Sequence, residues 1–336
     1  MTIPISILLV LASIFLLWFG ADWLVKGSSK LALSLNIRPI IIGLTVVAFG
    51  TSAPELVVSV FAAVEGQPEM ALGNVVGSNM ANIALVLGIC ALITPIEIQK
   101  DTLKSDIPFL VLVSFLTYVL ARFGAAGSGL ATGLSRLDGI IMLAFLVYFL
   151  LRLFFKSKAG NEVDPELQEI MMEQKSSNWK NILLLILGIA FLVAGAKALV
   201  TGGEFIATSM GIAPFFISLT MVAVGTSIPE LAASGMAAYK GETELCLGNV
   251  IGSNIMNLLI VLAVTVCILP IPVAPGIIRF ELPGIVFIAI ILYFMCRLGD
   301  LKLTRLKGIM LLILYVVYIY MSFVASKPSG QAVTLL

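Results

Sequence analysis

Two stretches of this sequence are near-copies of each other, and each places one glutamate in the middle of a hydrophobic segment. Residues 47–56 read VAFGTSAPEL and residues 222–231 read VAVGTSIPEL, which agree at eight of ten positions. Downstream, LGNVVGSNMAN (72–82) matches LGNVIGSNIMN (247–257). Both pairs of matching stretches are offset along the chain by the same number of residues, which is the number that separates Glu55 from Glu230. We call this offset the repeat spacing. An internal repeat that carries a carboxylate within each apolar segment is typical of cation transporters built from two halves.

The composition places the chain in a membrane. Hydrophobic residues make up 60% of the 336 residues and charged residues only 12%, whereas soluble domains carry about 25% charged residues. The sequence has no basic stripe, so we expect no nucleic-acid partner. It has no histidine, and its four cysteines lie singly in apolar segments. We therefore expect neither a disulfide framework nor a resident metal or other cofactor.

Cutting the sequence at charged and Gly/Pro-rich breaks predicts ten membrane spans. Apolar runs of about 20 residues without period-two alternation favour helices over a β-barrel. The expected fold is therefore all-α and polytopic, with the lipid bilayer as its surroundings. The spans are 4–25, 39–64, 70–93, 104–122, 134–155, 181–201, 213–239, 245–269, 281–297 and 306–325.

The distribution of basic residues predicts the orientation. The loops that follow odd-numbered spans hold 15 of the 20 Lys and Arg residues. The positive-inside rule then places both termini outside the cell and the 156–180 loop in the cytoplasm of a plasma-membrane protein. Residues one repeat spacing apart lie five predicted spans apart. Because five is odd, equivalent spans cross the membrane in opposite directions, so the halves should be inverted repeats. The expected parts are a first repeat (1–155), a linker (156–180), a second repeat (181–326) and a disordered tail (327–336).

Each repeated motif contains a helix breaker directly before its glutamate. Pro54 and Pro229 have no amide proton, so the carbonyls of Gly50 and Gly225 lose their helical donors. The second and seventh spans should therefore be broken. Irregular backbone at membrane depth is tolerated where it lines a cavity, and freed carbonyls there can bind cations.

Polar side chains around these breaks could supply further oxygen ligands. The motifs place hydroxyl groups beside each glutamate, and serine and asparagine four residues apart share one helix face. These residues are Thr51, Ser52, Thr226, Ser227, Ser78, Asn82, Ser253 and Asn257. The other four asparagines of the GN and SN pairs, Asn74, Asn79, Asn249 and Asn254, are expected to form interhelical hydrogen bonds instead.

Glu55 and Glu230 lie deep in their spans, where an ionised carboxylate must be paired, protonated or hydrated. An ion pair with a distant base such as Lys197 is the structural alternative to a binding site. Two carboxylates among hydroxyl and amide oxygens suit a hard cation, and calcium accepts six to eight oxygen ligands. Occupancy by one calcium or by sodium ions would balance the two charges, and each should exclude the other.

The two motifs closely resemble the alpha-repeats of the calcium/cation antiporter superfamily, in particular its sodium/calcium exchanger branch. The resemblance covers GTSAPE with GNVVGSNMAN in the first half and GTSIPE with GNVIGSNIMN in the second. It implies ten helices, alternating access, and sodium influx that drives calcium extrusion. It also implies that the first and sixth spans form a sliding pair. We expect a monomer with sodium and calcium as transported ions and no enzymatic activity.

The resemblance further implies a set of cation ligands. These would be Glu55, Glu230, Thr51, Ser52, Thr226, Ser227, Ser78 and Ser253, with the carbonyls of Ala48 and Ala223. Some members of the superfamily, including potassium-dependent ones, carry aspartate where this chain has Asn257, so potassium dependence is not expected.

Three rival functions differ in their sequence requirements. A proton-coupled calcium antiporter would resemble this chain, but that branch usually carries a second signature with Glu and His. A passive channel would not need two carboxylates in one tight site. An intramembrane enzyme would need a nucleophile with a base or a metal motif such as HExxH, and the sequence shows neither.

Overall fold

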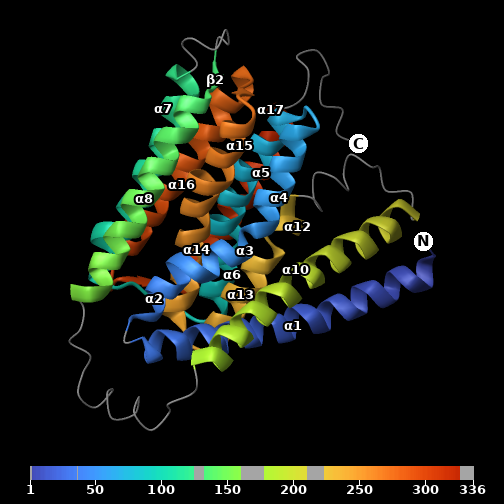
Figure 1. Cartoon of the computed structure of the whole chain (residues 1–336), viewed down its shortest axis with the longest axis vertical. Coiled ribbons are helices and arrows are strands. Elements are labelled where there is room, and N and C mark those ends of the chain that lie inside the picture. Colours follow the sequence, from blue (N-terminus) through green and yellow to red (C-terminus); the bar gives the residue numbers. More distant parts are fainter. Residues whose placement is uncertain (1, 36, 125–131, 160–177, 210–222, 326–336) are drawn as a thin grey trace.

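The computed structural model describes residues 2–35, 37–124, 132–159, 178–209 and 223–325, and these segments are almost entirely helical (Figure 1). The helices are α1 (Ile3–Ser34), α2 (Pro39–Ile42), α3 (Ala48–Thr51), α4 (Ala53–Val64), α5 (Pro68–Met80), α6 (Leu87–Ile93), α7 (Ile107–Phe123), α8 (Arg136–Ala159), α10 (Asn178–Ser209), α12 (Ala223–Thr226), α13 (Ile228–Tyr239), α14 (Thr243–Met256), α15 (Ala263–Ile268), α16 (Leu282–Arg297) and α17 (Arg305–Ala325). In these described segments, π-helical stretches join some of the helices: η1 (Gly43–Val47), η2 (Ala81–Val86), η3 (Thr102–Asp106), η5 (Asn257–Leu262) and η6 (Ile277–Glu281).

Within the described residues, eight helices are long and apolar enough to cross a membrane, or nine if the bent pair Pro39–Thr51 and Ala53–Val64 is one span. The polytopic all-α fold and the broken second span are therefore confirmed. The seventh predicted span, 213–239, begins in residues 210–222, outside the described part of the chain. The total of ten spans stays a prediction, as do the expectations for most of the linker and for the tail 327–336.

The helix ends differ from prediction mainly in α1 and α10. The sequence predicts that the first span ends at residue 25, but α1 continues to Ser34. It predicts the sixth span over 181–201, but α10 runs from Asn178 to Ser209. The predicted end of the first span rests on the charge of Lys26. In the structure Lys26 pairs with Asp22 four residues earlier on the same helix, at 2.8 Å, so its charge does not end the helix.

The helices α1 and α10 lie side by side and run obliquely to the rest of the bundle (Figure 1). A Cβ added at Gly20 would lie 2.9 Å from the Leu192 nitrogen, and one at Gly27 would lie 2.7 Å from the Asn181 oxygen. The later residue of α1, Gly27, thus contacts an earlier residue of α10 than Gly20 does, so the two helices are antiparallel. Their contacting positions recur every seven residues: Ser6, Ser13, Gly20 and Gly27 on α1, and Asn181, Gly188, Gly195 and Gly202 on α10. Small side chains at this spacing allow close backbone approach.

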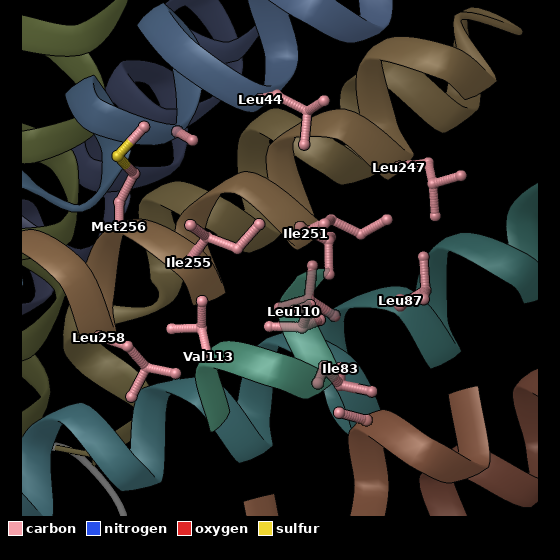
Figure 2. Packing of buried hydrophobic residues seen from close by; sticks show 14 of the residues in the cluster. Leu44, Ile83, Leu87, Leu110, Val113, Leu247, Ile251, Ile255, Met256 and Leu258 are labelled. Atoms are coloured by element: carbon pink, nitrogen blue, oxygen red, sulfur yellow. The ribbon is translucent and has the colours of Figure 1, made fainter. Parts of the chain in front are cut away.

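The helices, α1 and α10 included, contribute to one apolar core. Figure 2 shows buried side chains from several elements meeting in this core, among them Leu44, Ile83, Leu110, Ile251 and Leu258. In the same bundle Gly248 packs against η1 and α2, because a Cβ there would lie 2.6 Å from the carbonyl oxygen of Ile40. The segment LGNVIGSNIMN (247–257), on α14, thereby packs against the helix that leads into VAFGTSAPEL (47–56).

Two short antiparallel strand pairs connect the two halves of the sequence. Strand β1 (Ile96–Glu97) pairs with β4 (Lys302–Leu303), and β2 (Gly133–Leu134) pairs with β3 (Ile271–Pro272). In each pair one strand comes from each half. Strands β1 and β3 are also separated by the repeat spacing, so they occupy equivalent places in the two halves.

A buried carboxylate joins η3 to the end of α8. Asp106 is fully buried, and it binds Arg152 Nη2 at 2.6 Å and Lys156 Nζ at 2.9 Å. The Arg152 guanidinium also stacks over the rings of Phe109 and Phe149. The ion pairs therefore fix α8 against the preceding helix.

We expect Asp106→Asn to destabilise the fold without affecting ion specificity. Removing one partner of a buried ion pair leaves the other charges uncompensated. Because Arg152 and Lys156 are partly exposed, the loss should be about 2 kcal/mol rather than the full value for a buried pair. Thermal unfolding in detergent measures it, and Asp300→Asn, at an exposed acid outside this cluster, is the control. Equal melting temperatures for Asp106→Asn and the wild type would contradict this role.

Candidate functional site

The first repeated motif breaks its helix at one serine. Helix α3 ends at Thr51 and α4 begins at Ala53, with Ser52 between them at φ −82° and ψ 4°. The two parts of the span are bent by 43°. Pro54 lies in the first turn of α4, where its missing N–H is tolerated, but it cannot donate to the preceding turn. The break follows from the sequence.

The second motif repeats this break. Helix α12 ends at Thr226, α13 begins at Ile228, and Ser227 between them has φ −88° and ψ 4°. Each glutamate therefore occupies the first turn of the helix after a break, Glu55 on α4 and Glu230 on α13. A helix N-terminus carries a partial positive charge that favours an anionic side chain there.

Both glutamates are fully buried and they face the same polar centre. Each has 0% exposed surface. Ser52 Oγ donates to Glu230 Oε1 at 3.3 Å, which joins the first break to the second glutamate. Asn74 Nδ2 donates to the Glu55 carbonyl oxygen at 3.4 Å, and Asn74 Oδ1 accepts from Thr226 Oγ1 at 3.3 Å, which joins the first glutamate to the second break. The structure thus links each glutamate to the break of the other motif.

No basic side chain in the described part of the chain forms an ion pair with either glutamate. Lys197, the alternative partner, is exposed on α10. Two buried acidic groups without a basic partner carry a large desolvation penalty. The alternative of an internal ion pair with Lys197 is therefore not supported.

Hydroxyl and amide groups link the halves around this centre in a repeated pattern. Thr51 Oγ1 lies 3.3 Å from Asn249 Oδ1 and 3.3 Å from Ser253 Oγ. At the equivalent positions of the repeat, Thr226 Oγ1 lies 3.3 Å from Asn74 Oδ1 and from Ser78 Oγ. Thr51 in the first half therefore contacts the segment 247–257 of the second half, and Thr226 in the second half contacts the segment 72–82 of the first.

Two further serines orient the asparagines in this pattern. Asn74 Nδ2 donates to Ser59 Oγ at 3.0 Å, and Asn249 Nδ2 donates to Ser234 Oγ at 2.8 Å. The amide oxygens are thereby turned toward the threonines. Neither serine is among the predicted site residues, although Ser59 and Ser234 are also separated by the repeat spacing, a signal that could have identified them.

Interhelical hydrogen bonding, expected for four asparagines, is observed between described residues for Asn74 and Asn249. Asn254 Nδ2 instead donates to Val250 O on its own helix at 2.7 Å. Asn79 is buried, and neither of its side-chain polar atoms has a partner among the described residues. For Asn79 and Asn254 the described residues thus show no interhelical hydrogen bond.

Several buried polar atoms at the centre have no hydrogen-bond partner in the described segments. They are both carboxylate oxygens of Glu55, Glu230 Oε2, Ser227 Oγ, and the amide atoms of Asn82 and Asn257. Asn82 lies in the π-helical stretch η2, and Asn257 begins η5. π-helical stretches recur at functional sites, and buried groups left unsatisfied are destabilising unless water or an ion supplies a partner.

The resemblance also names the backbone carbonyls of Ala48 and Ala223 as ligands. The Ala48 carbonyl accepts the Ser52 N–H at 3.0 Å and the Thr51 hydroxyl at 3.4 Å. Ala223 begins α12, and its side chain lies outside the described part of the structure. The arrangement as a whole can bind a hard cation, because it offers two carboxylates with hydroxyl and amide oxygens around them.

Comparison with known proteins shows relatives of similar length. The profile of the family described as sodium/calcium exchanger protein matches residues 5–155 and 180–324. CaxA of Alkalimonas amylolytica is 40% identical over 95% of this chain and 99% of its own length. The sodium/calcium exchanger MaX1 of Methanosarcina acetivorans is 33% identical, with 96% of this chain and 99% of its own covered.

Solved structures and a more distant relative agree with this match. The sodium-calcium exchanger NCX_Mj, soaked with 10 mM Na⁺ and zero Ca²⁺, superposes with a TM-score of 0.81 at 32% identity, covering 95% of this chain and 99% of that one. The Ca(2+)/H(+) antiporter ChaA of Bacillus subtilis is 24% identical over 87% of this chain and 85% of its own. This chain, a multi-pass membrane protein with a duplicated acidic motif, belongs to the sodium/calcium exchanger protein family.

Proposed function

We propose that this protein is a secondary active antiporter that exchanges sodium for calcium across the plasma membrane by alternating access. The observation that carries the proposal is the pair of fully buried glutamates without a basic partner in the described residues. Two carboxylates balance the charge of one calcium ion or of two sodium ions. Because both ions need the same charges, binding of one opposes binding of the other, which couples their movements.

The proposed ligands are the two glutamates and the oxygens around them. The polar atoms without partners support this set, because a bound ion would satisfy them. The hydroxyls that already bridge the halves would turn toward the ion from both motifs. The set comprises Glu55, Glu230, Thr51, Thr226, Ser52, Ser227, Ser78, Ser253, Asn82, Asn257 and the carbonyls of Ala48 and Ala223.

The proposed architecture is a pair of inverted five-helix repeats, residues 1–155 and 181–326, joined by a cytoplasmic linker 156–180. The antiparallel contact of α1 with α10 supports it, as do the equivalent breaks at Ser52 and Ser227. The repeats would place the carboxylates near the midplane of the membrane. We propose that the protein works as a monomer with both termini outside the cell.

Calcium flux in proteoliposomes tests this function. Vesicles loaded with sodium and diluted into sodium-free buffer should take up radiolabelled calcium, and collapsing the sodium gradient should stop the uptake. Potassium substituted for sodium should not drive it. Absence of calcium uptake on an outward sodium gradient would refute the proposal.

A proton-coupled calcium antiporter is the second candidate. A carboxyl group can bind a proton in place of a metal ion. The similarity to ChaA, a relative named as a Ca(2+)/H(+) antiporter, supports this candidate. The same vesicles distinguish the two. A proton gradient that drives calcium uptake without sodium would favour the second candidate.

Pro229→Ala should weaken calcium binding. An alanine N–H at this position can donate to the Gly225 carbonyl, so helix can form across the break at Ser227. The backbone would straighten and Glu230 would turn away from its partner. We expect the calcium concentration for half-maximal uptake to rise several-fold, while Pro39→Ala at the start of α2 leaves it unchanged. Identical half-maximal concentrations for Pro229→Ala and wild type would contradict the role given to the break.

A further inference from the structure

An ion pair ties α1 to the end of α13. Asp22 Oδ1 on α1 lies 2.5 Å from Lys240 Nζ, and Lys240 directly follows α13. Both side chains are partly buried, with 18% and 24% of their surfaces exposed. Beside this pair the rings of Trp18 and Tyr239 are 6.4 Å apart. Helix α1 is therefore fastened to the second broken span at one end of the molecule.

The repeat places the same pair in the other half with its charges exchanged. At the repeat spacing, Asp22 of the first half corresponds to Lys197, and Lys240 of the second half corresponds to Glu65. Glu65 directly follows α4 as Lys240 directly follows α13, with φ −76° and −84°, and each is followed by a glycine at φ 78°. The two helix ends thus have the same backbone geometry, and each half could form one such ion pair.

Only the first of these two pairs is formed. Lys197 and Glu65 are both exposed, and neither forms an ion pair with any residue in the part of the chain that the structure describes. Helix α1 packs against α13, whereas α10 makes no comparable contact with α4 among the described residues. The α1–α10 pair is therefore displaced toward one of two positions that the repeat makes equivalent.

We propose that Asp22–Lys240 and Lys197–Glu65 are alternative latches, each of which holds the α1–α10 pair in one of the two access states. In the state seen here the first latch is closed and the second is open. Movement of α1 and α10 along the bundle would separate Asp22 from Lys240 and bring Lys197 to Glu65. This inference rests on the proposed alternating-access function.

The opposite charges of Asp22 on α1 and Lys197 on α10 give each helix a different partner. The acid pairs with Lys240 after α13, and the base can pair with Glu65 after α4. An ion pair of this partly buried kind contributes modestly, so each latch biases the two states by about fivefold rather than locking them. A stronger latch would slow transport by trapping one state.

Disulfide cross-linking in proteoliposomes tests the latches. One variant carries Asp22→Cys with Lys240→Cys, and the other carries Glu65→Cys with Lys197→Cys. A protease site inserted between residues 156 and 180 separates the halves after cleavage unless a cross-link joins them. With oxidant, the first variant should cross-link without ions, and the second should cross-link when sodium and calcium are both present. Each cross-link should stop exchange, and reductant should restore it.

Charge variants give a second readout. Lys240→Gln should raise the cross-linking yield of the Glu65→Cys, Lys197→Cys protein about fivefold. Lys26→Gln should not, because Lys26 binds Asp22 within α1 and does not reach α13. The swap of Asp22→Lys with Lys240→Asp restores an ion pair and should return the yield toward the starting value, which separates a latch from a folding defect.

The outcomes separate this inference from the function on which it rests. If the parent protein exchanges calcium but the Glu65→Cys, Lys197→Cys variant never cross-links, the latches are refuted while the exchanger proposal stands. If Lys240→Gln and Lys26→Gln change the yield equally, the Lys240 contact is not a latch. If the parent protein exchanges no calcium, the proposed function fails whatever the cross-linking shows.

Discussion

Glu55→Gln and Glu230→Gln should each abolish calcium exchange while leaving a folded protein. Glutamine has nearly the shape of glutamate but no charge, so one negative charge remains to balance a divalent ion inside the membrane. In such surroundings charge interactions are strong. We expect calcium uptake to fall about a hundredfold or more, equivalent to about 3 kcal/mol of binding free energy.

The control for these variants is the same change outside the site. Glu97 on β1 is exposed and pairs with Lys302 at 2.8 Å. The hydrogen bond from Lys302 lowers the pKa of the Glu97 carboxyl, so this acid is ionised at neutral pH. Glu97→Gln should therefore remove one charge and keep exchange near the wild-type rate. Normal calcium uptake by Glu55→Gln or Glu230→Gln would contradict the site.

Gly188→Leu should disrupt the contact between α1 and α10. A Cβ at Gly188 would lie 2.7 Å from the Leu24 nitrogen and 2.8 Å from the Gly20 oxygen, which are backbone atoms that cannot move aside. Overpacking typically destabilises by about 1–3 kcal/mol, and a clash with backbone lies at the upper end. We expect a lower melting temperature, because the close packing of the two helices is lost. Calcium uptake should fall at least about tenfold, because the proposed mechanism moves the two helices together.

Ala194→Leu is the matched control, because Ala194 is exposed on the same helix. The added leucine there should face outward, and melting temperature and uptake should be unchanged. If Gly188→Leu behaved like Ala194→Leu, close packing of α1 on α10 would not be required for folding or transport.

The helical breaks and the burial of the two glutamates could be predicted because they depend on local chemistry. Pro54 and Pro229 remove a hydrogen bond wherever the chain folds, and the repeat copies the consequence into both halves. The hydrophobic runs likewise predicted the polytopic fold, since a membrane span requires about 20 apolar residues.

What could not be predicted depends on contacts between distant segments. Nothing local distinguishes Lys240 from other loop lysines, and only the structure places it against Asp22. The burial of Asp106 between Arg152 and Lys156 is of the same kind. The π-helical stretch that begins at Asn257 has no sequence signal of its own. The seven-residue spacing of glycines on α10 was visible in the sequence, but only its partner helix gives it meaning.

Anomalous diffraction from crystals soaked in calcium, or in strontium as its heavier analogue, tests the central claim most directly. We expect one strong peak between the Glu55 and Glu230 carboxylates, within coordination distance of both, which weakens as sodium is raised. A peak that contacts only one of these glutamates, or none at this place when calcium is saturating, would contradict it.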